Sequence, residues 1–112
     1  MIRVPTDRPP TRPGEVLRKE FLRPMGVSQR TLTNAIGVPY QRVNELVNGH
    51  RGMTASTALR FAKFFGTSAA FWMNLQVRWD LYHTQKQEAD RLSTIQPYVS
   101  QTPETKSAPD TA

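Results

Sequence analysis

The chain has 112 residues and a formal net charge of +6, from 15 lysines and arginines against nine aspartates and glutamates. This length fits one small domain, and the basic charge favours a polyanionic partner, either nucleic acid or an anionic membrane surface. The chain has no cysteine, which excludes disulfides, thiolate nucleophiles and cysteine-ligated metal centres. No segment approaches the run of about 18 apolar residues that a transmembrane helix requires.

The two ends of the chain have the composition of segments outside a core. Residues 1–12 are predicted to form an extended, flexible proline-rich arm, because proline fixes φ and removes a backbone donor. Residues 93–112 are rich in Ser, Thr, Pro and Gln, and we predict a disordered tail there. One helical domain is expected over residues 13–92. The amino terminus lacks the apolar run of a signal peptide, so the cytoplasm is the expected compartment.

Glycine and proline divide the predicted domain into five helices. The first is predicted from Gly14 to Leu22, ending before Pro24, because proline disfavours helix in the residue before it. No segment shows the alternation of a β-strand, so the fold class is all-α. The other four helices are predicted over Ser28–Gly37, Pro39–Gly49 and Thr54–Gly66, and from Thr67 or Ser68 to about Leu92.

The second and third predicted helices have the spacing of a helix-turn-helix. They are joined by Ile36, Gly37, Val38 and Pro39, a short turn with glycine where a positive φ is needed. Val38 is expected to fill the angle between the two helices. An ordinary helical hairpin with a solvated polar face would show the same turn. The basic charge and an outer face rich in Asn, Gln and Arg favour DNA binding, because these side chains recognise base edges.

The candidate DNA contacts fall into two groups. Base readers are expected on the first turns of the third helix, which enters the major groove. Contacts to the phosphate backbone are expected at the start of the second helix and on both sides of the third. The predicted base readers are Tyr40, Gln41, Arg42 and Asn44, and the predicted backbone contacts are Ser28, Gln29, Pro39, Asn48, His50 and Arg51.

Three segments carry a resemblance to a known family: RPGEVLRKEFLRPMGVSQ (12–29), IGVPYQRVNELVNGHRGMTASTALRFAKFFGTS (36–68) and FWMNLQVRWDL (71–81). They resemble the HigA family of antitoxins, within the Cro/repressor-like helix-turn-helix group. The resemblance implies a five-helix repressor-like domain that dimerises and represses its own operon. It also implies a partner, a small endoribonuclease toxin that cleaves mRNA. This group usually has a small apolar residue where the chain has Thr33, which fits if its hydroxyl bonds a backbone carbonyl.

The last predicted helix carries a stripe of large apolar side chains longer than a small core needs. Phe71, beside the stripe, is expected in the core. Because one helix-turn-helix covers too little DNA for tight specificity, we expect a twofold homodimer on an inverted repeat of double-stranded operator DNA. The stripe is the predicted dimer interface, since large aromatic side chains favour such interfaces. It consists of Trp72, Leu75, Trp79 and Tyr82.

A toxin that binds and cuts RNA is expected to be basic, yet this chain is itself basic. The toxin contact is therefore predicted to be local, pairing apolar anchors with the few acids available outside the helix-turn-helix. The first helix offers such a mixture. The predicted toxin-binding residues are Glu15, Val16, Glu20 and Phe21.

Other chemistries find little support in the sequence. His50 and His83 are far apart and lie in no metal-ligand motif, so no metal site is predicted. The chain has no phosphate-binding or nucleophile motif and no paired acids, so neither a cofactor nor an enzyme activity is expected. No helix combines a basic face with a large apolar one, so no membrane binding is expected. Two alternatives stay open beside the antitoxin: a repressor without a toxin, and a toxin-binding module with little DNA-binding activity.

Overall fold

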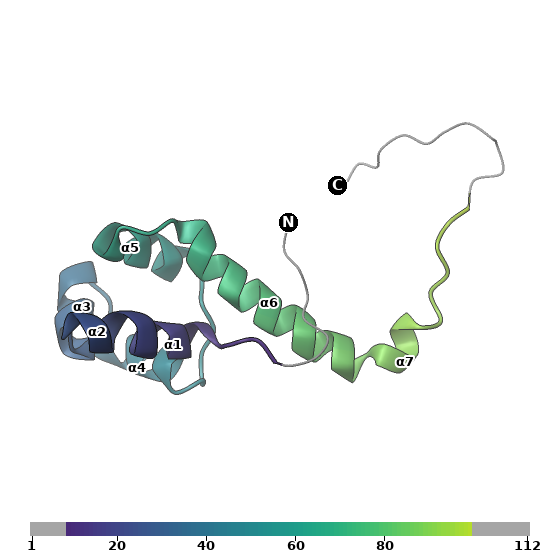
Figure 1. The fold of residues 1–112 in the computed structure, drawn as a ribbon, viewed down its shortest axis with the longest axis horizontal. Helices are drawn as coiled ribbons and strands as arrows, with labels where there is room; N and C mark the ends of the chain where they lie inside the picture. Colours follow the sequence, from purple (N-terminus) through teal and green to yellow (C-terminus); the bar gives the residue numbers. More distant parts are fainter. Residues whose placement is uncertain (1–8, 100–112) are drawn as a thin grey trace.

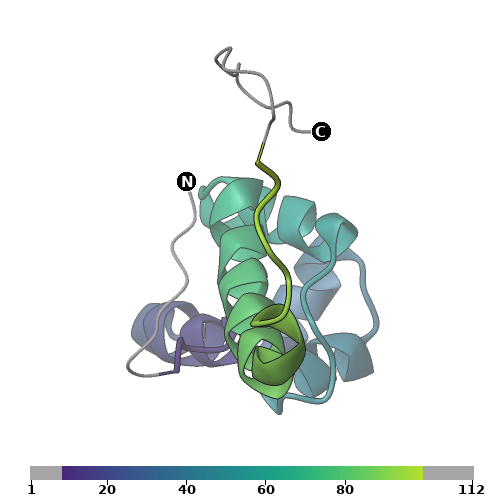
Figure 2. The same ribbon diagram turned by 90° about the vertical axis from the view of Figure 1, so that its right-hand side faces the viewer.

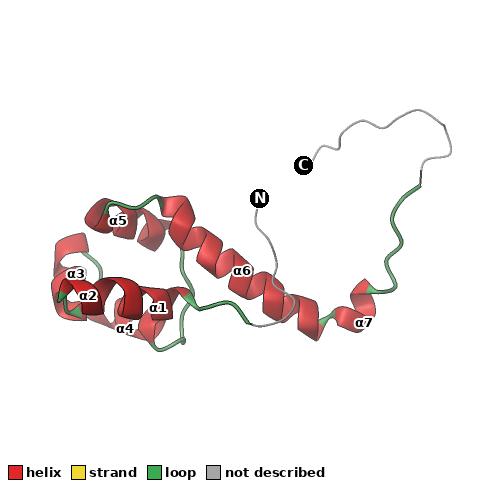
Figure 3. Ribbon diagram, viewed as in Figure 1, coloured by secondary structure: helices red, strands yellow, loops and turns green. Residues whose placement is uncertain are grey.

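The computed structural model describes residues 9–99, and these residues form an all-helical fold (Figure 1). No strand occurs within this described range, where loops connect the helices (Figure 3). The predicted all-α fold class is therefore confirmed. Most of the predicted arm (1–8) and of the predicted tail (100–112) lies outside the described residues. The described part of the tail, residues 93–99, is a turn followed by exposed loop.

Within residues 9–99 five helical regions follow one another, and the first and the last of them are subdivided. The first region is one continuous stretch whose middle part, η1, is a π-helix. The last region is a long helix followed by a single short turn. The elements are α1 (Pro13–Val16), η1 (Leu17–Leu22), α2 (Arg23–Met25), α3 (Gln29–Ile36), α4 (Tyr40–Val47), α5 (Ala55–Phe65), α6 (Ala69–Gln87) and α7 (Ala89–Leu92).

The first helix passes through Pro24, so the prediction that it ends before this residue is wrong. A proline ring normally clashes with the carbonyl four residues earlier in an α-helix. Here the preceding turn is π-helical, and its wider ring leaves room for the proline at the start of α2. The helix ends instead at Gly26, which has a φ of 67°.

Caps at the other helix ends follow the local chemistry of the sequence. The side chains of Ser28, Thr54 and Ser68 each accept a hydrogen bond from the backbone N–H three residues later. Gly37 and Gly66 end α3 and α5 in the left-handed region. These predicted boundaries are confirmed. Pro39, predicted as the first residue of the third helix, is instead its N-cap.

The predicted last helix is interrupted. It runs to Gln87 rather than to Leu92, and Glu88 leaves the helical conformation before the short α7. Side chains from Thr84 to Leu92 are exposed, so no buried contact stabilises a continuous helix there. Figure 1 shows the second half of α6 extending away from the other helices, with α7 at its far end.

The core lies between the amino-terminal helix, the α3–α4 pair, α5 and the first half of α6 (Figures 1 and 2). Its centre is aromatic: the rings of Phe61 and Trp72 are fully buried, with centroids 5.0 Å apart. Phe21 packs against Trp72 at 4.9 Å. Gly14 brings the start of α1 directly against α4, because a Cβ there would overlap the carbonyl oxygen of Leu46. This packing fixes the α3–α4 pair on the body of the molecule.

Candidate nucleic-acid interface

The turn between α3 and α4 has the predicted helix-turn-helix geometry. Gly37 adopts a φ of 73°, and its N–H donates to the carbonyl of Thr33 over 2.9 Å. The N–H of Val38 donates to the same carbonyl over 3.2 Å. The Val38 side chain is buried in the core cluster, as predicted for the residue that fills the angle between the helices.

Thr33 packs in the way expected from the sequence, with its hydroxyl bonded to a backbone carbonyl. Its side chain is buried, and its hydroxyl donates to the carbonyl of Arg30 over 3.0 Å. A buried hydroxyl without a partner would be costly, and this hydrogen bond removes the cost. The unusual threonine is therefore compatible with close packing of α3 on the core.

Polar side chains from both helices are linked across the outer surface of the α3–α4 pair. The side-chain amide of Asn44 donates to the side-chain oxygen of Gln29 over 3.1 Å. Asn48 donates to the oxygen of Asn44 over 3.1 Å. These contacts join the first residue of α3 to the middle and end of α4. Three predicted DNA contacts therefore lie in one hydrogen-bonded row, although Gln29 is bonded to α4 rather than left free.

Tyr40 lies at the start of the same surface and is half-exposed. Its hydroxyl accepts a long hydrogen bond from Asn44, at 3.5 Å. The guanidinium carbon of Arg30 lies 4.4 Å from the centre of its ring, within the range of a cation–π contact. Arg30 was not among the predicted contacts, yet it adds a positive charge beside Tyr40, one of the predicted base readers. The sequence could have indicated Arg30 as a DNA contact, because it directly follows Gln29 at the start of α3.

The chain reverses direction at the end of α4. Gly49 has a φ of 81°, and the N–H of His50 donates to the carbonyl of Glu45 over 2.8 Å. This turn returns Arg51 to the side of the helix, where its Nε lies 2.9 Å from Oε1 of Glu45. Glu45 also accepts a hydrogen bond from Gln41 over 3.2 Å. A carboxylate absent from the predicted site thus contacts two of its members.

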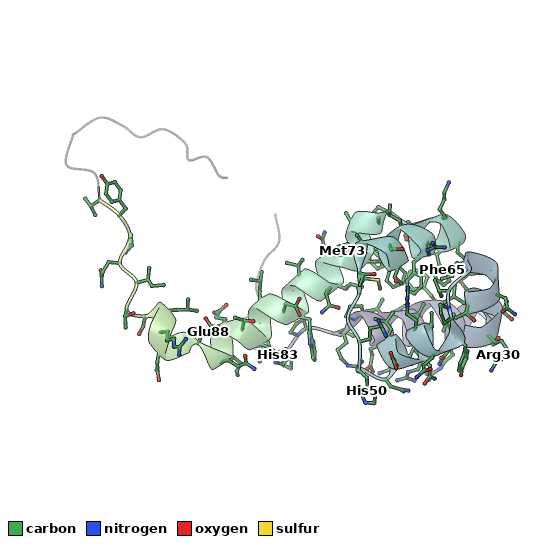
Figure 4. All side chains as sticks on the ribbon, turned by 180° about the vertical axis from the view of Figure 1, so that it is seen from behind. Arg30, His50, Phe65, Met73, His83 and Glu88 are labelled. Carbon is green, nitrogen blue, oxygen red and sulfur yellow. The ribbon has the colours of Figure 1, made fainter. Side chains whose placement is uncertain are left out.

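The remaining predicted DNA contacts are near the same surface. Pro39 and Gln41 are exposed, and Arg42 is half-exposed on α4. His50 is exposed on the turn after α4 (Figure 4). Ser28 is exposed, but its hydroxyl oxygen is already used in capping α3.

Two residues of the predicted dimer interface are buried inside the protomer. Trp72 is fully buried, and its indole N–H donates to the hydroxyl of Thr67 over 2.8 Å. Only 8% of Tyr82 is exposed. Two of the four stripe residues are therefore covered within the protomer, Trp72 in the core and Tyr82 outside the core cluster. Phe71, expected in the core, is instead 38% exposed.

Leu75 and Trp79 are the two members of the predicted interface that stay partly accessible. Leu75 packs against the edge of the core. Trp79 is half-exposed, and its ring lies 4.2 Å from the ring of His83, centre to centre. These two side chains lie on the half of α6 nearest to residues 9–11, with which they line open cavities.

Three of the four predicted toxin-binding residues, Glu15, Val16 and Glu20, line one open groove, and Phe21 lies outside it. Phe21 is half-buried and lies in the aromatic cluster, with its ring 4.9 Å from that of Phe65, so part of its surface packs within the protomer. Amphipathic spacing alone cannot distinguish an anchor for a partner from a core residue. Pro9 and Pro10 line the same groove.

Glu15 is surrounded by positive charge. Its carboxylate lies 2.8 Å from Nζ of Lys19, and 3.4 Å and 3.5 Å from the guanidinium groups of Arg12 and Arg18. The hydrogen bond from Lys19, with the three charges, lowers the pKa of Glu15 below its ordinary value. This acid is already compensated within the chain and offers little net negative charge to a basic partner.

Two contacts that sequence reasoning missed hold the interface in place. Gln76 on α6 accepts a hydrogen bond from the backbone N–H of Met53 over 2.7 Å, which fixes the loop after α4. Arg60 on α5 donates to the carbonyl of Ile36 over 2.7 Å, at the end of α3. Both partners are more than 20 residues distant in sequence, so no local pattern could reveal them.

Residues 9–99 contain no cluster of three His, Cys, Asp or Glu side chains positioned to bind a metal. Within the same range, no helix is long and apolar enough to cross a bilayer.

Comparison with known proteins agrees with this geometry. A helix-turn-helix family model matches residues 18–72. The antitoxin HigA-1 of Vibrio cholerae is 36% identical over 92 residues, which are 82% of this chain and 87% of the relative. The chain belongs to the HigA family of helix-turn-helix antitoxins. The resemblance stated from the sequence is thereby confirmed.

Solved structures of this family share the fold closely. The antitoxin HigA of Pseudomonas aeruginosa, solved with the higBA promoter, superposes with a TM-score of 0.76 and 37% identity. The similarity covers 80% of this chain and 99% of that one. An addiction module antidote protein of the HigA family from Coxiella burnetii gives a TM-score of 0.76 and 38% identity, covering 81% and 100% of the two chains.

Proposed function

We propose that the protein is an operator-binding antitoxin that represses its own operon and neutralises a small mRNA-cleaving endoribonuclease. The observation that carries the DNA-binding part is the row of hydrogen-bonded side chains from Gln29 to Asn48 on the exposed side of α3 and α4. Side-chain amides read base edges in the major groove, and their mutual contacts reduce the entropy lost on binding. The solved relative with promoter DNA supports the same role.

In the proposed complex, the exposed start of α4 lies in the major groove. Tyr40, Gln41, Arg42 and Asn44 contact base edges. The backbone contacts come from both sides of this helix, through the amino terminus of α3 and the turn after α4. We add Arg30 to this set because its guanidinium lies over the ring of Tyr40. Binding to an operator requires the compartment that holds the chromosome, so the proposal includes a cytoplasmic location.

The functional unit in this proposal is a twofold dimer on an inverted repeat. Leu75 and Trp79 remain candidates for its interface, since both are partly accessible. Light scattering on the full chain tests this directly. The Trp79→Glu variant is expected to shift a dimeric parent toward monomer, because the substitution places an unpaired charge in the interface. A parent that is monomeric at concentrations where it binds DNA tightly would contradict the dimer.

For the toxin, the proposed contact is the amino-terminal wall of the groove, lined by Val16 and Glu20 near Pro9 and Pro10; Trp79 lines the same groove from α6 and is assigned to the dimer interface. This surface lies on the amino-terminal helix and leaves α4 free, so toxin and operator can bind together. The experiment is co-expression of the full chain with the product of the neighbouring small reading frame, followed by affinity capture.

Glu20→Arg is expected to reduce capture of a basic toxin, whereas Glu88→Arg, at the far end of α6, is expected to leave it unchanged. Equal capture by both variants would exclude this groove. If the parent captures no toxin and still binds the operator, the result favours the alternative of a repressor without a toxin. As a HigA-type regulator, the protein is proposed to act by binding and to have no enzyme activity.

A further inference from the structure

Glu45 differs in charge from the residues around it on the α3–α4 surface. Between Ser28 and Arg51 it is the one acidic residue, against three arginines. It lies on α4, four residues after Gln41, and therefore on the same side of the helix as this predicted base reader. A carboxylate on a surface that faces DNA phosphates is repelled by them, so its presence there calls for a physical explanation.

The two carboxylate oxygens of Glu45 have separate partners. Oε2 accepts a hydrogen bond from Nε2 of Gln41 over 3.2 Å. Oε1 lies 2.9 Å from both Nε and one terminal nitrogen of Arg51. One acid thus holds a side chain proposed to read bases and a side chain proposed to bind phosphate.

The backbone is shaped for this contact. The turn at Gly49, closed by the hydrogen bond from His50 to the carbonyl of Glu45, brings Arg51 back beside the helix. The contribution of this ion pair to folding is small, because both side chains are partly exposed and such pairs contribute about 0–1 kcal/mol. Its main consequence is therefore for the DNA-binding surface.

We propose that Glu45 is a specificity-determining residue: it orients Gln41 for base recognition and restrains Arg51, so that it weakens non-specific DNA binding more than operator binding. Non-specific binding depends on the number of phosphates that the protein neutralises. Holding Arg51 against a carboxylate removes about one such contact from encounters with arbitrary DNA. In the operator complex Arg51 reaches its phosphate while Glu45 keeps Gln41 oriented, so the loss is confined to arbitrary DNA. The inference rests on the proposed function of operator binding.

Glu45→Gln is the decisive substitution, because it removes the charge and keeps an oxygen that can accept from Gln41. Each additional phosphate contact steepens the slope of log K against log salt by about 0.9, which is about fivefold in affinity at 0.15 M salt. We expect Glu45→Gln to bind non-specific DNA about fivefold more tightly, with this steeper slope. Operator affinity is expected to change by less than about twofold, so the specificity ratio falls.

The measurement is fluorescence anisotropy with the full chain at several salt concentrations. One labelled duplex carries the promoter upstream of the protein's own reading frame, and the other has the same base composition in shuffled order. Glu88→Gln is the matched control, since it makes the same charge change at the end of α6, far from Arg30 and His50 (Figure 4). It is expected to leave both affinities unchanged. An equal rise in this control would overturn the proposal, because net charge alone would then explain the effect.

A second comparison tests the route through Arg51. In an Arg51→Gln background, Glu45→Gln is expected to leave the salt slope unchanged. A slope that still steepens would overturn the proposed restraint. Binding by the parent chain distinguishes a failure of the proposed function from a failure of the proposed role of Glu45. No preference of the parent for the promoter duplex would contradict the proposed function, whereas a preference that Glu45→Gln leaves intact would contradict the role of Glu45.

Discussion

The aromatic interior between α5 and α6 and the exposed surface of α4 are held by opposite kinds of contact. The interior consists of large rings with centroids about 5 Å apart, shielded from water. The surface consists of short polar side chains that hydrogen-bond one another while still exposed to solvent. The first region stabilises the fold through burial, and the second contributes little to stability but keeps its side chains in place. Substitutions in the two regions should therefore change different observables.

The largest expected effect is in the interior. Trp72→Ala should lower the free energy of unfolding by about 3–5 kcal/mol, because it leaves a cavity where a fully buried ring stood. Urea denaturation of parent and variant measures the difference. Tyr98→Ala is the control, since 89% of that side chain is exposed, and it should leave the unfolding midpoint unchanged. A loss below about 1 kcal/mol for Trp72→Ala would mean that the ring is not part of the core.

A smaller effect is expected where the two regions meet. A Cβ at Gly14 would overlap the carbonyl oxygen of Leu46, so Gly14→Ala should force α1 away from α4. We expect a loss of about 1–3 kcal/mol in urea denaturation, the usual range for overpacking. In Gly52→Ala the new Cβ would meet only the side-chain amide of Gln76, at 3.1 Å, so we expect a smaller loss, through the hydrogen bond that Gln76 accepts from Met53. Equal losses in the two variants would argue against a rigid contact between α1 and α4.

On the surface of α4, Arg51→Ala should weaken binding to operator DNA more than binding to shuffled DNA, because Glu45 already holds Arg51 in encounters with arbitrary DNA. The expected loss on the operator is about fivefold at 0.15 M salt, with the salt slope flatter by about 0.9. Anisotropy titrations measure it, and urea denaturation should show no large change. Arg91→Ala, an exposed cation on α7, controls for net charge and should leave binding unchanged. A flatter slope in both variants would point to general electrostatics instead of a phosphate contact.

The smallest expected effect concerns Glu15. Its pKa is lowered in the folded chain, chiefly by the hydrogen bond from Lys19, so the ionised carboxylate stabilises the fold above the ordinary pKa of 4.5. This stabilisation should be lost as the pH falls through the lowered pKa. The stability difference between the parent and Glu15→Gln should therefore shrink at acidic pH, measured by urea denaturation across a pH series. A difference that is independent of pH would contradict this ion-pair cluster.

The same contrast explains which features the sequence predicted. Helix caps and the turn at Gly37 were predictable because their chemistry is local, confined to a residue and its neighbours within one turn. The aromatic stripe of α6 was interpreted too broadly. Helical spacing identifies an apolar face, but it does not reveal whether that face meets the protomer's own core, as Trp72 does, or a second copy.

The candidate site was predictable as a set of residues and not as a set of contacts. Tyr40, Gln41 and Asn44 followed from their place on the third predicted helix. The contacts of Arg51 with Glu45 and of Gln76 with Met53 depend on how loops return the chain to a helix. Such tertiary contacts join residues by fold rather than by spacing, so composition and periodicity carry no signal for them.

The central claim, that the exposed side of α4 reads an operator, is tested most directly by one measurement. It is the affinity of the full chain and of Gln41→Ala for the promoter upstream of the protein's own reading frame, compared with a shuffled duplex of equal composition. We predict that the parent prefers the promoter, and that Gln41→Ala loses about 1–3 kcal/mol on the promoter but not on the shuffled duplex. Equal binding of the parent to both duplexes, or an unchanged preference in Gln41→Ala, would contradict it.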